Sequence, residues 1–212
     1  MSDTLVESSA ESAFLDLHKK LLEQGRPALV ELQEAALNRF ESLGFPYSKH
    51  EMFTFVNTKG LVATSFSLSD GSAQVSEDFV AGHIYPDCED QCLVFVDGVF
   101  DRGLSRFEGV SANLVSLSEA DQELKDYLSK TAENENDVFA ALSTAFCSEG
   151  LVFKVDDNTQ ISGTVQVLFV STGRSVGPAM HAPRLVWQLG KLAEVKVIEK
   201  FVGTEGGYFI NS

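Results

Sequence analysis

Several residue patterns in this sequence could support chemistry, and the first is a metal site. His50-Glu51 begins like the zinc-binding helix motif of metalloproteases, in which a second His follows four residues after the first. Thr54 occupies that position, so the second zinc ligand is absent. The pattern therefore does not predict a protease.

Ser175 lies in Gly-Arg-Ser-Val-Gly, which matches the Gly-x-Ser-x-Gly nucleophile elbow of hydrolases. An elbow must open a helix, but Pro178 and Pro183 interrupt the residues that follow. In that fold the triad order is Ser, then Asp or Glu, then His. No Asp or Glu lies between Ser175 and the later His181, so the triad cannot be completed in this order. We interpret the segment as a glycine-rich turn between strands.

A third pattern gathers possible metal ligands in residues 83–92, namely His83, Asp87, Cys88, Glu89 and Cys92. A structural zinc site needs a second close pair of ligands, and the neighbouring sequence has none. We interpret Cys92 as a small buried residue that begins a strand, and Cys88 as part of a polar turn. Cys147 is predicted to be an unreactive residue of a helix.

Composition narrows the classes of partner. The chain has 212 residues and a formal charge of −15, which disfavours nucleic acid and anionic membranes because phosphate binding needs clustered Lys and Arg. The first twelve residues lack the positive region of a secretory signal, and no apolar run is long enough to span a membrane. Three Cys fit a reducing compartment, so we expect a cytoplasmic protein.

The elements that must position these residues begin with helices. Ser8 and Glu11 have capping-box spacing, and the apolar stripe that follows ends at Gly25. A second stripe begins after Pro27 and ends at Gly44. The sequence therefore predicts a helical hairpin over residues 1–45.

Residues 46–150 are predicted to form a small α+β module. Residues 61–70 alternate like a strand, and Asp97-Gly98 between two apolar runs indicates a β-hairpin. A very acidic helix is expected from Ser118 to Glu135, with Leu124, Tyr127 and Leu128 on its apolar face.

A further helix should follow within the same module. Asn136 or Asp137 is its expected cap, and Gly150 its expected end. Beyond it, residues 151–212 contain only short strand-like runs separated by turns. Such runs suit a sandwich, a barrel or the first coils of a β-solenoid. The last of them predicts an unpaired strand edge near Phe201 to Ile210.

Four stretches, in the same order, resemble the SufB and SufD family of iron–sulfur cluster assembly proteins. They are an aromatic-rich segment, a Val-Phe-Val-Asp-Gly hairpin, an Ala-Phe helix before a strand, and a Pro-Arg strand pair ending in Val-Ile-Glu: residues 43–61, 93–105, 141–155 and 182–203. The chain departs from the family at Phe53, Thr54 and Phe55, where Trp, Lys and Tyr are usual. Family members also continue past the end of this sequence, through a long β-helix and a helical region.

The resemblance implies an α+β fold in which residues 151–212 are the opening strands of a right-handed parallel β-helix. It implies a non-catalytic, SufD-like component of a scaffold complex, because the chain lacks the cysteine-rich scaffold of the SufB side. The implied partners are a SufB-like scaffold protein and a SufC-like ABC ATPase, the latter bound through the absent C-terminal region. The iron–sulfur cluster would be handled by the assembled complex, with no cofactor intrinsic to this chain.

No catalytic, cofactor-binding or metal residue is carried over from the family. The sequence leaves open whether iron contacts any of four residues: His83, Cys88, Cys92 and Cys147. The aromatic segment is expected to be a structural clasp, with a partner-contact surface as the alternative. The side chains expected to pack between helices and strands are Phe45, Tyr47, Phe53 and Phe55. The alternative function is a β-solenoid that acts on or binds carbohydrate, which would place two acids in one cleft.

Overall fold

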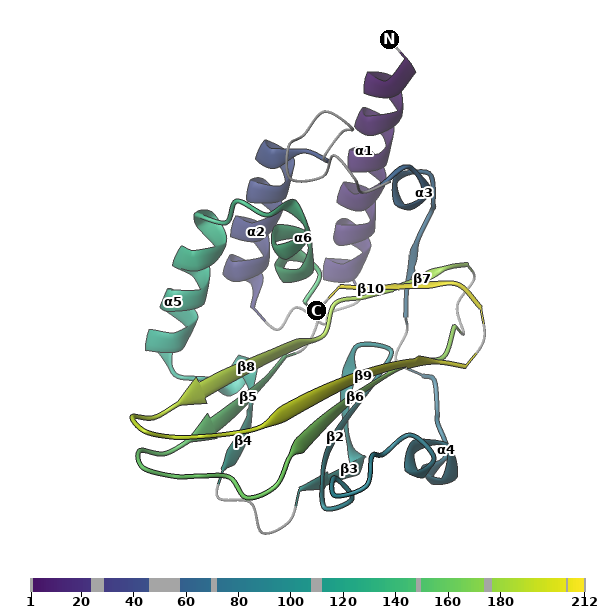
Figure 1. Ribbon diagram of the computed structural model, residues 1–212. Coiled ribbons are helices and arrows are strands. Elements are labelled where there is room, and N and C mark those ends of the chain that lie inside the picture. The colour runs from purple at the N-terminus through teal and green to yellow at the C-terminus, as the bar shows by residue number, and fades with distance from the viewer. Residues whose placement is uncertain are drawn as a thin grey trace.

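The computed structural model describes residues 2–23, 29–45, 58–69, 72–107, 112–147, 150–173, 177–204 and 206–211, with side chains from residue 13 onward. Most helices gather at one end of the molecule and most strands at the other, with α4 (Glu77–Ala81) lying beside the strands (Figure 1). The α+β class predicted from the sequence is confirmed. None of the described helices combines the length and apolar character needed to cross a bilayer.

Four of the helices enclose the first hydrophobic core: α1 (Ser2–Glu23), α2 (Val30–Leu43), α5 (Gln122–Glu133) and α6 (Val138–Ala145). The other described helices are α3 (Lys59–Val62) and α4 (Glu77–Ala81), with a 3₁₀ turn η2 (Leu117–Glu119). Phe14 of α1 lies 6.1 Å from Phe40 of α2 and 6.1 Å from Phe146 after α6, measured between ring centroids. The two predicted amino-terminal helices therefore share their core with a helix from the middle of the chain.

Helix boundaries follow the capping signals in part. The carboxylate of Asp137 accepts hydrogen bonds from the backbone N–H groups of Phe139 and Ala140, so the predicted cap of α6 is confirmed. Gly44 ends α2 with φ of 65°, as predicted. The predicted start of α1 at Ser8 is wrong, because the helix already runs from Ser2.

Three predictions in residues 46–150 need correction. Residues 61–66 do not form a strand, since α3 extends to Val62 and strand pairing is limited to Ser67 and Leu68. The acidic helix begins at Gln122, capped by Asp121, and Tyr127 is 67% exposed instead of facing the core. Gly150 does not end a helix but begins a strand.

The strands form three sheets. They are β1 (Ser67–Leu68), β2 (Gln91–Val96), β3 (Val99–Phe107), β4 (Asn113–Ser116), β5 (Gly150–Val155), β6 (Val165–Ser171), β7 (Ala179–His181), β8 (Arg184–Leu189), β9 (Val197–Gly203) and β10 (Tyr208–Ile210). Their spatial orders are β1-β7-β10, β3-β2-β6-β9 and β4-β5-β8. The predicted hairpin is confirmed, because β2 and β3 pair antiparallel across Asp97 and Gly98, with φ of 47° and 84°.

The last six strands form two stacked turns of chain, which we call the first coil (residues 150–181) and the second coil (residues 184–210). Each strand of the second coil pairs in parallel with the corresponding strand of the first: β8 with β5, β9 with β6 and β10 with β7. The register does not slip within any of these pairs, so β6 and β9 stay aligned from Val165 opposite Val197 to Ser171 opposite Gly203. Figure 1 shows β8 beside β5 and β9 beside β6.

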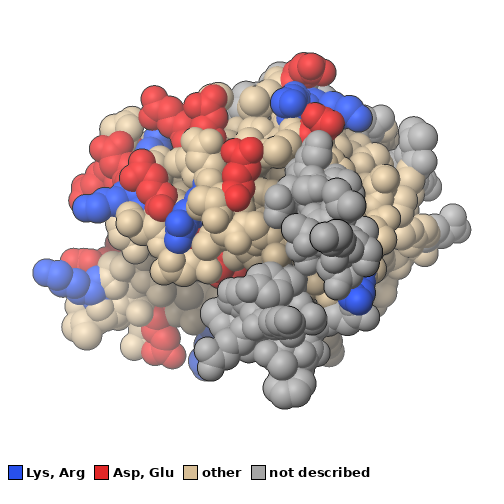
Figure 2. Space-filling model, turned by 90° about the horizontal axis from the view of Figure 1, so that it is seen from above, with Lys and Arg blue, Asp and Glu red and all other residues tan. Residues whose placement is uncertain are grey.

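Acidic side chains dominate part of the helical end. Figure 2, which views the molecule from above, shows Asp and Glu gathered on one side with a few Lys and Arg among them. A groove of about 490 Å³ between α2 and α5 is lined by Glu31, Glu34 and Glu133 together with Arg39. The guanidinium of Arg39 on α2 donates to the backbone oxygen of Glu135 and to the amide oxygen of Asn136. It therefore links α2 to the connection between α5 and α6.

Candidate interaction surface

Several residues singled out in the sequence lie outside the described residues. They are the His50, Glu51 and Thr54 pattern, Ser175 of the elbow-like segment, and Tyr47, Phe53 and Phe55 of the predicted clasp. Phe45, the described member of that clasp, is buried and packs 5.3 Å from both Phe14 and Phe40, between ring centroids. For this residue the predicted packing role is confirmed.

The segment after α4 is held against the sheet by backbone contacts. The buried amide of Gln166 on β6 accepts from the N–H of Tyr85 at 2.7 Å and donates to the carbonyl of His83 at 2.9 Å. Lys200 on β9 also donates to the carbonyl of His83, at 3.0 Å, and its ammonium lies 4.5 Å from the centroid of the Tyr85 ring. These contacts fix the segment as a structural strap over β6 and β9.

Within this strap the candidate ligands do not converge. Among the described residues, no three His, Cys, Asp or Glu side chains are placed to hold a metal ion together. The imidazole of His83 packs edge-on against Phe79 at 4.6 Å between ring centroids. The contacts that anchor the strap to the sheet are made by the backbone groups of His83 and Tyr85 and by the Tyr85 ring.

The three cysteines are buried, and none forms a disulfide. Burial raises the pKa of Cys92 to about 12, and the neighbouring Cys88 acts in the same direction. Burial and the adjacent acids Glu89 and Asp87 likewise raise the pKa of Cys88. Because the thiolate is the nucleophile, both thiols are poorly suited to nucleophilic attack at neutral pH. Cys147 lies directly after α6, in a small buried cluster with Leu117 of η2 and Val152 of β5.

A buried polar cluster lies where the hairpin turn meets the first coil. The carboxylate of Asp97 accepts from the N–H of Thr172 at 2.7 Å and from its hydroxyl at 2.6 Å. Nε2 of His181 lies 3.4 Å from Oδ1 of Asp97, and the side chains of this His and Asp are 1% and 2% exposed. A substrate has no access to groups this enclosed, so the cluster fastens three segments together.

This buried polar cluster also explains the titration of His181. Burial lowers the pKa of the imidazole, while the nearby carboxylate of Asp97 partly opposes that shift. Sequence reasoning noticed Asp97 only as a turn residue and His181 only as a poor triad member. Their pairing carries no local signal, because the turn, the end of β6 and β7 are brought together by the sheets alone.

The second coil leaves one side uncovered, the side that faces away from the first coil. We call this side, formed by β8, β9 and β10, the open end. In the three sheets β8, β9 and β10 are all edge strands, so each is paired on one side only. The unpaired edge predicted near Phe201 to Ile210 is therefore present. Most of the large apolar side chains that are exposed in the described residues belong to this coil: Leu189, Leu192, Val197, Ile198, Phe201 and Tyr208.

Side chains at the open end continue columns that start in the buried sheets. Phe95, Phe169 and Phe201 are register partners on β2, β6 and β9, with ring centroids 5.2 Å and 4.7 Å apart. A second column places Trp187 of β8 against Phe153 of β5 at 4.6 Å. Since Phe201 is 46% exposed, the first column stops with one ring face uncovered.

Comparison with known proteins gives two results. A family model described as the SufBD protein N-terminal region matches residues 7–167. A curated relative, an iron–sulfur cluster assembly SufBD family protein of Synechocystis, is 25% identical over 181 residues. That alignment covers 82% of this chain but 39% of the relative, so the chain spans well under half the length of the protein that it matches.

Proposed function

The chain belongs to the SufBD family, and on that premise we propose that it is a structural component of iron–sulfur cluster assembly. The observation that carries the proposal is the family match over residues 7–167, which includes the helical core and the first strands. The family resemblance drawn from the sequence motifs is confirmed by this match. A carbohydrate-acting solenoid is not favoured, since neither comparison points to that class.

Within the family we propose a SufD-like, non-catalytic role. Two features of the described residues support it. The one buried acid and imidazole pair among them, Asp97 and His181, is closed to substrate. The thiol of Cys92 is fully buried in β2, and burial raises its pKa to about 12, so it is enclosed in the sheet. The cluster would then be a cargo of the assembled complex, with its ligands supplied by other chains or regions.

We also propose that the two coils open a longer parallel β-helix. The support is the unbroken parallel register of β9 along β6 and of β8 along β5. Stacked coils bury their faces against one another, so a further coil would cover the open end as the second coil covers the first. The three parts expected from the sequence, residues 1–45, 46–150 and 151–212, remain a prediction.

The proposed partners follow from the family role. A SufB-like scaffold protein would bind the SufD-like chain, and a SufC-like ABC ATPase would bind through sequence beyond that of this chain. The formal charge of −15 makes nucleic acid and anionic membranes poor partners, and we propose a cytoplasmic location.

The test is an anaerobic co-purification. The tagged chain is expressed together with the SufB-like and SufC-like proteins of the same organism, and the retained proteins, iron and sulfide are quantified. We expect stoichiometric recovery of the SufB-like protein. The proposal is rejected if the chain recovers neither protein and if its omission leaves the iron and sulfide content of the SufB-like protein unchanged.

A further inference from the structure

The four-stranded sheet has a second edge, at β3, on the side of the stack opposite the open end. The chain leaves this sheet after β3, because the next strand, β4, joins the sheet of β5 and β8. Among the described residues no strand pairs with the outer side of β3. This edge is therefore set by the order of the strands within the chain itself.

The pairing of β3 with β2 is interrupted. Asp101 pairs with Val94, and the next pair is Arg106 with Cys92, so the strand segment between these pairs is longer on β3. Residues 102–105, which we call the insert, stand opposite a single residue of β2. An ordinary β-bulge adds one residue to one strand, and the insert adds more than that.

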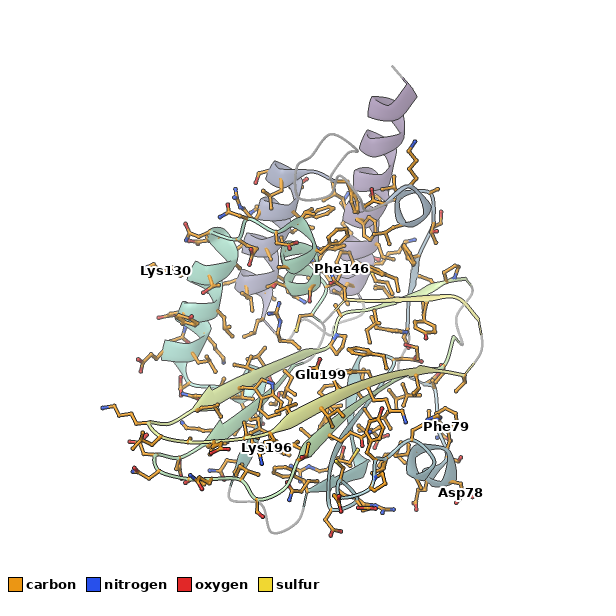
Figure 3. The ribbon with its side chains drawn as sticks, viewed as in Figure 1. Asp78, Phe79, Lys130, Phe146, Lys196 and Glu199 are labelled. Atoms are coloured by element: carbon orange, nitrogen blue, oxygen red, sulfur yellow. The ribbon has the colours of Figure 1, made fainter. Side chains whose placement is uncertain are left out.

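The insert is closed by its own polar groups. The carboxylate of Asp101 accepts from the N–H of Leu104 at 3.0 Å, and the hydroxyl of Ser105 donates to the carbonyl of Asp101 at 2.6 Å. The same hydroxyl accepts from the N–H of Val94 on β2 at 2.9 Å, in place of a backbone carbonyl of β3. Leu104 packs against the apolar cluster behind β2, as does Phe79 of α4, which Figure 3 labels beside the strands. The insert is therefore a packed and hydrogen-bonded part of the fold.

This construction changes what β3 presents to another molecule. A sheet edge captures a second chain through an unbroken row of backbone N–H and C=O groups, and bulges and charges prevent such pairing. The insert breaks that row, whereas β9 pairs along its whole length without a slip. Arg102 and Arg106 are exposed on the same edge. Two copies of β3 paired antiparallel about the insert would bring Arg102 of one copy toward Arg106 of the other, which adds repulsion.

We propose that the insert is a barrier to self-association, which prevents β3 from pairing with β3 of a second copy of this chain. The strand needs such a barrier because it covers β2, a buried apolar strand, with inward-facing Phe100 and Phe107. Without the insert it would be a regular amphipathic edge strand, the kind that pairs between molecules. The inference rests on the pairing of β2 and β3 and holds whether or not the chain acts in cluster assembly.

The test replaces residues 102–105 by a single Leu in the full chain. That Leu would lie opposite Leu93 and face the core between Phe100 and Phe107, so β3 would pair evenly with β2. Sedimentation velocity over a range of concentrations gives the oligomeric state. Hydrogen exchange at the lowest and highest concentrations identifies the strand that pairs, and far-UV circular dichroism compares the fold with that of the unaltered chain.

The matched control carries Arg102→Thr and Arg106→Thr, which remove the charges of the edge and keep the backbone of the insert. It separates the effect of the interrupted backbone from that of the charges. Any association through the open end would protect β9 in all three chains, so protection of β3 is the quantity compared.

We expect the shortened variant to form dimers, in which the amides of β3 exchange at least about tenfold more slowly at the highest concentration than at the lowest. The unaltered chain and the control should show no such dependence at β3. The proposal is overturned if β3 gains no protection in the shortened variant, or gains it equally in the control or the unaltered chain. Loss of the native circular dichroism spectrum in the shortened variant would mean that the insert serves folding, and would overturn the proposal as well.

Discussion

The first and second coils have the same order of strands, but they differ in what covers them. Every residue of β6 and β7 is buried, whereas β9 is exposed at most positions. The first coil lies between two layers of strands, since β6 has β2 on one side and β9 on the other. Burial in this region is therefore set by position in the stack more than by the composition of each strand.

The aromatic column offers the largest test of that comparison. Phe169→Ala removes a buried ring that lies between Phe95 and Phe201, and we expect it to lower the free energy of unfolding by about 3–5 kcal/mol. Phe201→Ala, one coil further, should cost under about 1.5 kcal/mol because one side of the ring is already in water. Urea denaturation of both variants measures the contrast. Equal losses would mean that the second coil is as well packed as the first.

The buried polar cluster provides the next contrast. Asp97→Ala leaves the N–H and hydroxyl of Thr172 without their acceptor, and we expect a loss of about 2–4 kcal/mol. At the corresponding point of the second coil, the hydroxyl of Thr204 donates to the backbone oxygen of Thr172 from an exposed position. Thr204→Ala should therefore cost about 0.5–1 kcal/mol or less. Thermal unfolding ranks the two variants, and the reverse order would contradict the assigned roles.

The cluster should also give the protein a pH dependence. The pKa of His181 is lowered by burial, so the unfolded chain takes up its proton near the ordinary value of 6.5 and the folded chain only at lower pH. Stability from this group is complete above pH 6.5 and is lost as the pH falls below that value. The pKa of His18, in the helical core against Phe146, is lowered by burial in the same way.

Each histidine should account for part of the acid sensitivity. We expect His181→Gln and His18→Gln each to reduce the loss of unfolding free energy between about pH 7.5 and about pH 5.5, and the double variant to reduce it further. Urea denaturation at the two pH values gives the result. An unchanged pH dependence in His181→Gln would show that its imidazole is not shielded from solvent as described.

The smallest expected effect concerns the turns that end β5 and β8. Asn158 and Leu192 occupy matching positions in these turns, after the register partners Val155 and Leu189, and both have φ of 58°. Asn tolerates this left-handed conformation, but Leu does not. Leu192 is 82% exposed, so its side chain contributes little packing there. Leu192→Asn should raise the unfolding free energy by about 0.5–1 kcal/mol, and Asn158→Leu should lower it by a similar amount, as urea denaturation would measure.

Two sequence patterns of this protein mislead for an identifiable physical reason. Tyr127 fits the apolar stripe of its helix, but α5 packs through Leu124 and Leu128 and leaves the Tyr ring in water. Residues 61–66 alternate like a strand, yet Lys59–Val62 forms a short helix before the two-residue strand β1. A short apolar run fits both the helical period of about 3.6 residues and the strand period of about 2 residues, and packing against neighbouring elements decides which structure forms.

Local features of this protein could be read from its sequence. The cap at Asp137, the turn at Asp97 and Gly98, and the strands of residues 150–155, 165–171 and 184–189 are signalled within a few residues, because caps, turns and alternation act over that range. The family motifs and the acidic charge can also be identified from the sequence.

The choice of which strands stack, and what they leave uncovered, depended on the three-dimensional arrangement. Parallel pairing joins strands that are distant in the chain through backbone hydrogen bonds, which every residue except proline can make, so side chains carry little record of the partner. For the same reason the contact of Asp97 with Thr172 and His181 has no sequence signature. The insert in β3 could be recognised only after the register between β2 and β3 was known.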